Sequence, residues 1–305
     1  MPRISDLGLQ QILLANFERA QSGAAERQAQ LSSGKVSDRY SGIGAQTPTL
    51  LSSEGVLARA SAFSAATSAA SARLLTQESA MQSIADSIGR LRGQLIETLA
   101  TGGGELIAGG LAAEAQRVLA ALNTESGGVY LFGGVDGAQA PVAAQSVADI
   151  AAAPDAASLF QTTSRSSLYI EEGVSVDGGP TAREIGVDVV DALRSLAVAP
   201  QTLGAFQGAP TSQQAQFLTG LIARLDQVSS AIYTEMGMNG LAQGAVADAA
   251  ERTSRQRDLA EIVASEIEDV DLAEVIARLS LDRTATEASA RALAQASELS
   301  LLNYL

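Results

Sequence analysis

The sequence predicts a mainly α-helical fold: a long antiparallel helical bundle or coiled coil, formed by the N- and C-terminal segments, with a small inserted β-rich (α+β) domain. Three observations lead to this expectation. Apolar residues recur at steps of three and four near both ends of the chain, a similar pattern runs without proline through about residues 52–100, and the β-strand patterns gather in about residues 129–209. Steps of three and four keep one face of a helix toward a partner helix. Both ends of the chain are therefore predicted to pack against other helices.

The first helix is predicted over about residues 7–31. Its apolar stripe advances by steps of 4, 3, 4 and 7 through Leu13, Phe17, Ala20, Ala24 and Leu31. The following Ser32-Ser33-Gly34 combines two weak helix formers with a glycine that is typical of a helix C-terminus. Residues 35–48 contain two glycines and a proline, and they are predicted as a loop.

A much longer helix is predicted over residues 52–100. At about 1.5 Å per residue this segment would form a rod of roughly 70 Å, which is longer than an ordinary globular core requires. Gly89 and Gly93 lie four residues apart. Either they let another backbone approach closely, or they only weaken the long helix to an extent that the fold tolerates. Three glycines at 102–104 end the helix, and another helix is expected over residues 105–123.

The middle of the chain has the character of a small α+β domain. Residues 129–132 are predicted as a short strand that ends at Gly133-Gly134. Residues 167–176 alternate apolar and polar side chains and are predicted as a strand pair that turns near Gly173. A helix is expected over residues 187–196.

Helical patterns resume near Thr211 and continue to the end of the chain, with interruptions expected at Gly237, Gly240 and Gly244. The last apolar stripe comprises Leu272, Ile276, Leu279, Thr286, Ala290 and Leu293, and the apolar run at residues 299–305 adds Leu301 and Leu302. We predict three parts: a terminal coiled-coil assembly region (1–45 plus 255–305), a long-helix rod (46–128 plus 210–254) and an outer β-rich domain (129–209). The two terminal stripes are the predicted assembly seams.

Composition argues against an enzyme. The chain contains no His and no Cys, so it cannot build a Ser-His or Cys-His nucleophile, or a metal site that uses these ligands. A net charge of -14 disfavours nucleic acid and anionic lipid as partners. We expect no catalytic residue, no cofactor and no metal, and no insertion into a membrane, because no segment approaches the roughly 20 apolar residues that a spanning helix needs.

Two groups of residues could be taken for ligand-binding sites, and each has a simpler interpretation. The acidic cluster of Glu266, Glu268, Asp269, Asp271 and Glu274 is interpreted as a solvated surface near a helix start, where the helix dipole favours negative charge. It lacks the glycine turn of a calcium loop. The glycine runs at 102–104 and 133–134 lack the spacing of a phosphate-binding loop and are interpreted as turns.

Several local sequences resemble the flagellin family. Leu31-Ser32-Ser33-Gly34-Lys35 is similar to the element that closes the first helix of flagellins. The acids of residues 266–274 resemble the family's acidic element just ahead of the last helix, and the apolar run at 299–305 resembles its hydrophobic C-terminus. Tyr130-Leu131-Phe132-Gly133-Gly134 is closer to hook-associated members than to filament subunits. Residues 36–44 depart from the acidic, alanine-rich stretch of flagellins, which also disfavours a filament subunit.

The resemblance implies a structural subunit of the bacterial flagellum that joins hook to filament. It would assemble helically with its own copies and contact a hook-side junction protein and the filament flagellin, and an export chaperone would be a further partner. Export would follow the flagellum-specific type III route without a cleaved signal peptide, which agrees with the absence of a basic and apolar leader in residues 1–6. The alternatives are a short filament flagellin and a cytoplasmic coiled-coil adaptor.

Overall fold

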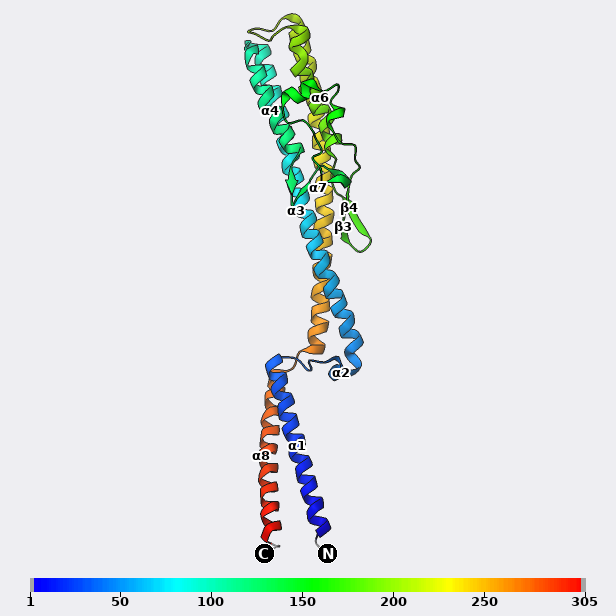
Figure 1. Ribbon diagram of the computed structural model, residues 1–305, viewed down its shortest axis with the longest axis vertical. Helices are drawn as coiled ribbons and strands as arrows, with labels where there is room; N and C mark the ends of the chain where they lie inside the picture. Colours follow the sequence, from blue (N-terminus) through cyan, green and yellow to red (C-terminus); the bar gives the residue numbers. More distant parts are fainter. Residues whose placement is uncertain (1–2, 303–305) are drawn as a thin grey trace. The chain divides into compact units, whose positions relative to one another are not determined.

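The computed structural model describes the backbone of residues 3–302 and the side chains of residues 8–295. The chain divides into two compact units (Figure 1). The terminal unit comprises Met1–Ala60 and Arg255–Leu305, and the central unit comprises Ser61–Ser254. Long helices dominate both units, as the sequence predicts, and the described strands form two short antiparallel pairs.

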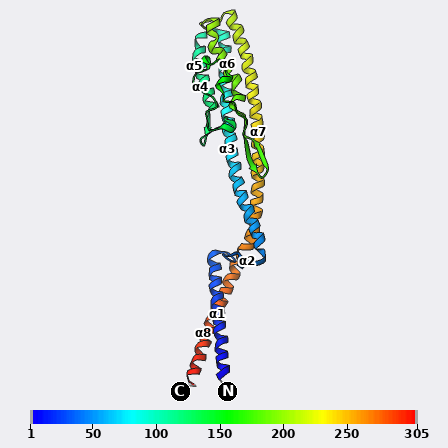
Figure 2. The same cartoon turned by 45° about the vertical axis from the view of Figure 1, so that its right-hand side comes forward.

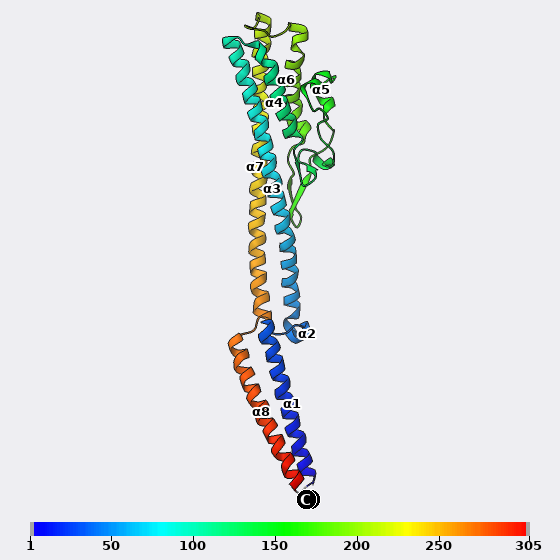
Figure 3. The ribbon, with the colours of Figure 1, turned by 60° about the vertical axis from the view of Figure 1, so that its left-hand side comes forward.

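The terminal unit contains a pair of helices, α1 (Arg3–Ser33) and α8 (Leu272–Leu302), which lie side by side in Figures 1 and 3. Helix α1 ends where the sequence predicts. Gly34 has a positive φ of 73°, and its N–H donates to the carbonyl of Gln30 at 2.8 Å. A glycine adopts this conformation without steric cost and satisfies a carbonyl that the helix leaves open.

The segment after α1, for which the sequence predicts a loop, contains a short helix, α2 (Tyr40–Ile43), and a 3₁₀ turn (Gly44–Gln46). Helix α3 (Thr47–Thr101) then begins, with Pro48 in its first turn, where its missing N–H has no helical partner to lose. Leu50 of α3 packs with Ala264 and Ile267 of α7 (Ser212–Glu268) in a small hydrophobic core within the terminal unit.

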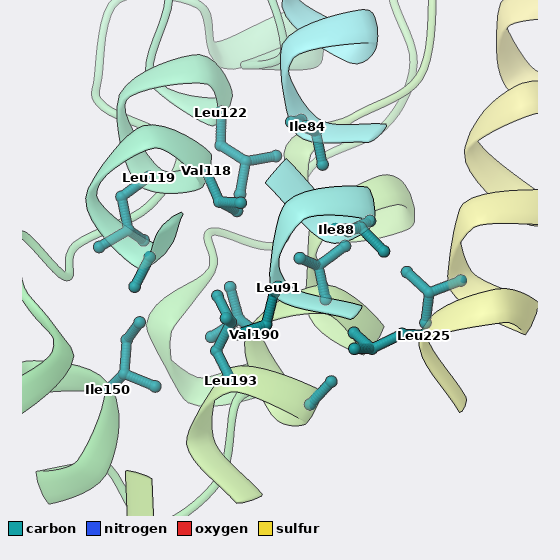
Figure 4. Packing of buried hydrophobic residues seen from close by; sticks show 14 of the residues in the cluster. Ile84, Ile88, Leu91, Val118, Leu119, Leu122, Ile150, Val190, Leu193 and Leu225 are labelled. Atoms are coloured by element: carbon teal, nitrogen blue, oxygen red, sulfur yellow. The ribbon is translucent and has the colours of Figure 1, made fainter. Parts of the chain in front are cut away.

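The central unit is organised around α3 and α7, which run side by side (Figure 3). A 3₁₀ turn (Gly104–Leu106), α4 (Ile107–Leu122) and α6 (Ala182–Leu203) complete its main helices. Figure 4 shows Leu91 of α3, Val190 of α6 and Leu225 of α7 in one buried cluster. Helix α6 starts five residues earlier than predicted because Thr181 and Glu184 form a capping box.

Helix α7 passes through Gly237, Gly240 and Gly244 without a break, so the predicted interruptions are wrong. Each glycine weakens a helix by about 1 kcal/mol relative to alanine. The buried side chains of Ile232 and Val246, on either side of the glycines, hold the helix in place. A Cβ added at Gly89 or Gly93 of α3 would meet no atom within 4 Å, so neither glycine admits a close backbone within the described chain.

The inserted segment starts with β1 (Glu125–Ser126) and β2 (Val129–Tyr130), joined by Gly127 and Gly128. The predicted strand at 129–132 is therefore shorter. A second hairpin pairs β3 (Ser167–Glu171) with β4 (Val174–Asp177) in the predicted place, with Leu168 opposite Val176. Helix α5 (Val147–Ala152), for which the sequence showed no clear pattern, packs beside α6 (Figure 2).

One hydrophobic core joins the inserted segment to the helices. Phe132 and Ile150 from the insertion are buried in the same cluster as Ile84 of α3 and Val118 of α4. The side chain of Arg165, just before β3, connects Asp177 of β4 at 3.2 Å, Glu184 of α6 at 3.0 Å and Glu235 of α7 at 2.9 Å. Residues 129–209 thus share their core with the long helices of the central unit.

Within the described residues, no helix is both long and apolar enough to cross a membrane. Across the same residues, no three His, Cys, Asp or Glu side chains are grouped so as to hold a metal ion.

Two helical glycines give a matched test of this packing. A Cβ at Gly186 of α6 would lie 2.7 Å from Cε1 of Phe160 and 2.9 Å from Cδ1 of Leu122, whereas one at Gly237 of α7 would meet open space. We expect Gly186→Ala to lower the free energy of unfolding by about 1–2 kcal/mol, because overpacking outweighs the gain in helix propensity. Gly237→Ala should raise it by up to about 1 kcal/mol.

Urea unfolding of the full chain, followed by circular dichroism, measures both changes. Stabilisation by both substitutions would contradict the close packing of α6 against Phe160.

Candidate assembly surface

The predicted seam of α1 lies on the side that faces α8. All five of its members are partly buried there: Leu13, Phe17, Ala20, Ala24 and Leu31. The small side chains in the middle of the stripe allow the two helices to approach closely. A Cβ at Gly23 would lie only 2.9 Å from the carboxylate of Asp282 on α8. Sequence reasoning missed Gly23, although its position between Ala20 and Ala24 extends the run of small residues.

The predicted stripe of α8 is only partly turned toward α1. Leu279 is buried and Leu293 is partly buried, but Leu272, Ile276 and Ala290 are exposed. Apart from Ala292, the positions that are at least partly covered follow the same steps of four and three in another register: Val275, Leu279, Asp282, Thr286, Ser289 and Leu293. The backbones of Leu301 and Leu302 belong to α8, while their side chains lie outside the described residues.

Helix α8 begins with a side-chain cap. Oδ1 of Asp271 accepts hydrogen bonds from the backbone N–H groups of Ala273 at 2.9 Å and Glu274 at 3.2 Å, as an N-terminal cap does. The N–H of Val275 then donates to the carbonyl of Asp271 at 2.9 Å. Val275, rather than Ile276, is the buried member of this first turn.

Large apolar side chains remain on the outer faces of the helix pair. On α8, Leu272 is 50%, Ile276 54% and Leu281 69% exposed. On α1, Leu9, Ile12 and Leu14 are also exposed. An exposed apolar side chain by itself is ordinary, but several on the two helices that already form a seam are typical of a surface that is covered by another molecule.

The structure brings together the two sequence elements that resemble flagellins. The segment after α1 and the segment after α7 pair in antiparallel fashion through a bridge between Lys35 and Asp269. The N–H of Val36 donates to the carbonyl of Glu268 at 2.7 Å, and that of Val270 donates to the carbonyl of Gly34 at 3.0 Å. These hydrogen bonds hold the end of α1 near the start of α8. We call this pairing of residues 34–36 with residues 268–270 the paired connection.

An ion pair accompanies this backbone pairing. Nζ of Lys35, the chain's only lysine, lies 3.1 Å from a carboxylate oxygen of Glu268. The hydrogen bond and the negative charge of Glu268 raise the pKa of Lys35 above its ordinary value. A raised lysine pKa stabilises the paired connection at neutral pH, and this contribution is lost as the pH rises through the folded-state pKa.

Gln30 supports the connection from the last turns of α1, and sequence reasoning missed it. Its side chain is buried; Nε2 donates to the carbonyl of Val36 at 2.9 Å, and Oε1 accepts from Nη1 of Arg27 at 2.6 Å. A buried polar group needs such partners, because an unsatisfied amide is costly. The sequence contained no signal for this role beyond a glutamine placed near a helix end.

The acidic cluster is used mostly for local structure. Glu268 binds Lys35, Asp269 accepts from the hydroxyl of Ser265, Asp271 caps α8, and Glu274 pairs with Arg278 four residues later. Glu266 is the exception: its side chain is exposed and, within the described residues, forms neither a salt bridge nor a hydrogen bond. This arrangement agrees with the interpretation of the cluster as a solvated helix-start surface.

The pentapeptide at 130–134 lies in the core of the central unit. The carbonyl of Leu131 accepts hydrogen bonds from Nη2 of Arg73 and from Nε2 of Gln77, both at 2.9 Å. The Phe132 side chain is fully buried, and its carbonyl accepts from the N–H of Ala182 at the start of α6 at 2.8 Å. The segment therefore connects α3 to α6 and exposes little of its apolar surface.

The single lysine allows a direct test of the paired connection. We expect the Lys35 side chain to titrate above the ordinary lysine pKa of about 10.4, and Glu268→Gln to return the pKa toward that value. Glu266→Gln, which removes a charge two residues away, is the control and should leave the pKa nearly unchanged. ¹³C NMR of the chain labelled at Lys Cε measures it without ambiguity. Equal effects of the two substitutions would argue against the ion pair.

Comparison with known families agrees with this arrangement. The model described as the bacterial flagellin N-terminal helical region matches residues 4–136, and the model of the C-terminal helical region matches residues 212–305. A comparison with curated proteins finds no match.

Two solved structures share the fold. A protein described as a flagellar hook-associated protein from Vibrio parahaemolyticus superposes with a TM-score of 0.58 at 15% identity, covering 73% of this chain and 97% of that one. FlgL of Bacillus cereus superposes with a TM-score of 0.55 at 14% identity, covering 70% and 98%. Because the two flagellin models together match well over half of the sequence, the chain belongs to the flagellin family and is a structural, non-enzymatic component of the bacterial flagellum.

Proposed function

We propose that this protein is the adaptor that joins the flagellar hook to the filament, and that it assembles with its own copies through α1 and α8. The observation that carries the proposal is the exposed apolar surface of the terminal helix pair, above all Leu272, Ile276 and Leu281 on α8. Burial of one such side chain contributes about 1.5–3 kcal/mol. Neighbouring copies that cover these residues would stabilise an assembly by several side chains per subunit.

Two sequence features favour the junction over the filament. Residues 36–44 depart from the acidic, alanine-rich stretch of flagellins. The pentapeptide Tyr130–Gly134 resembles hook-associated members in sequence. Its Leu131 carbonyl accepts hydrogen bonds from Gln77 and Arg73. A short filament flagellin is the alternative within the family.

The proposal includes a route and a set of partners. The subunit would leave the cell unfolded through the flagellum-specific type III route, without cleavage of a signal peptide, escorted by an export chaperone. It would then contact a junction protein toward the hook and the filament flagellin toward the filament. The absence of cysteine agrees with this route, because no disulfide can form before the chain is exported.

The two apolar rows of α8 make different contributions, and substitutions separate them. We expect Ile276→Asp to leave the subunit folded but to reduce its recovery in sheared flagella severalfold, because a charge would enter the surface that neighbouring copies cover. Val275→Asp should instead lower the helix content of the subunit, since Val275 is buried against α1.

Ala113→Asp is the control for the added charge. Ala113 is an exposed residue of α4 in the central unit, outside the two helices through which we propose assembly. Circular dichroism of the purified chain and immunoblots of sheared flagella give the two readouts. Normal recovery of Ile276→Asp would refute an assembly role for this row.

Deletion of the gene tests the junction role itself. We expect intact hooks and filament subunits shed into the medium, because the first filament subunits would have no adaptor on which to assemble. Electron microscopy of hook-basal bodies and immunoblots of the medium show both effects. Hooks that still carry a second junction protein and partial filaments would favour a filament flagellin, and a chain found only in the cytosol would exclude both flagellar roles.

A further inference from the structure

A polar cavity of about 430 Å³ lies beside the paired connection, within the terminal unit. Its lining includes three cationic side chains, those of Arg27, Lys35 and Arg39, and two acidic ones, those of Glu26 and Asp38. Lys35 is neutralised by Glu268, and Arg27 lies 3.6 Å from Glu26. Arg39 is exposed and forms no salt bridge within the described residues. The cavity therefore presents the Arg39 guanidinium to solvent, together with the exposed carboxylate of Asp38, which also forms no salt bridge within the described residues.

The complementary surface is on the end of α7. Between Asp258 and Ala277 the chain carries seven acids and no base: Asp258, Glu261, Glu266, Glu268, Asp269, Asp271 and Glu274. Most of these have partners in the same chain. Glu266 has no ion-pair partner among the described residues, and it shares a helix face with Leu259 and Ile262, which are 66% and 55% exposed.

We propose that this face of α7, with Glu266 at its end, docks on the Arg39 cavity of a neighbouring copy. The inference rests on the proposed assembly and names one of its contacts. Charge complementarity supports this occupant: within the described part of the chain, Arg39 is one of the cations without an ion-pair partner. Glu266 is one of the exposed anions without one, and it shares its helix face with exposed apolar side chains. The same acidic segment already supplies Glu268 to Lys35 at the rim of the cavity, which shows that the rim accepts a carboxylate from this segment.

Helix geometry requires a second copy. Residues two positions apart on an α-helix point about 200° apart around its axis. Since Glu268 faces its own Lys35, Glu266 points away from the cavity of its own chain and toward solvent. Tyr40, which follows Arg39 and is about half exposed, offers apolar surface to Leu259 and Ile262.

The contact joins two different surfaces, one on each copy. A contact of this kind is heterologous, so repetition generates a ring or a helix rather than a closed dimer. This geometry fits a subunit of a tubular appendage, and burial of the exposed apolar residues would add to the attraction between Arg39 and Glu266.

Disulfide cross-linking tests the contact in the assembled appendage, because the chain has no cysteine of its own. We expect the full chain with Arg39→Cys and Glu266→Cys to form a ladder of multimers when sheared flagella are oxidised. Each single-cysteine variant can give no more than dimers. The pair Arg39→Cys with Glu97→Cys is the control, since Glu97 is an exposed residue of the central unit.

Charge reversal provides a second readout. Arg39→Glu and Glu266→Arg should each lower recovery of the chain in flagella severalfold, and the double reversal should restore it. A chain recovered normally in flagella but without the ladder and without the rescue would overturn this contact and leave the proposed function standing. A wild-type chain absent from flagella would overturn both.

Discussion

Two helices packed side by side can cover only one face of each other, and this limit governs the terminal unit. The row of α8 that contains Val275 and Leu279 is buried against α1, but Leu272, Ile276 and Leu281 remain exposed. A pair of helices cannot enclose these side chains. Because a helix in a protein gains most of its stability from packing, the helix pair lacks the stability that covering them would add. The surface that stays exposed in one subunit is the surface available to the next.

The central unit encloses a core of its own. Helices α3, α4, α6 and α7 surround a continuous core, and the inserted segment contributes Phe132 and Ile150 to it. Polar contacts fix the insertion in place, since Gln77 donates to the carbonyls of Leu131 and Gly178 at 2.9 and 2.8 Å. The central unit therefore has a closed core of its own. The terminal unit is an incomplete helix pair, and we propose that neighbouring copies complete it on assembly.

Sequence periodicity predicted the long helices, the turn at Gly173 and the helix end at Gly34, because apolar spacing and glycine conformation act locally. It could not determine the rotation of α8, since the rows through Val275 and through Ile276 both contain apolar residues and share Leu279, and which row is buried depends on packing against α1. It also placed breaks at Gly237, Gly240 and Gly244, where packing overrides propensity. The roles of Gln30 and Gln77 depend on carbonyls outside their own helices, which no local pattern reveals.

Hydrogen exchange measured by mass spectrometry, on the dilute subunit and on the same chain in isolated flagella, tests the central claim most directly. If the terminal helices are completed by neighbouring copies, residues 1–45 and 265–305 exchange rapidly in the dilute subunit and become protected in flagella, while the core of the central unit is protected in both. Terminal segments that are already as well protected in the dilute subunit as the central core would contradict the account.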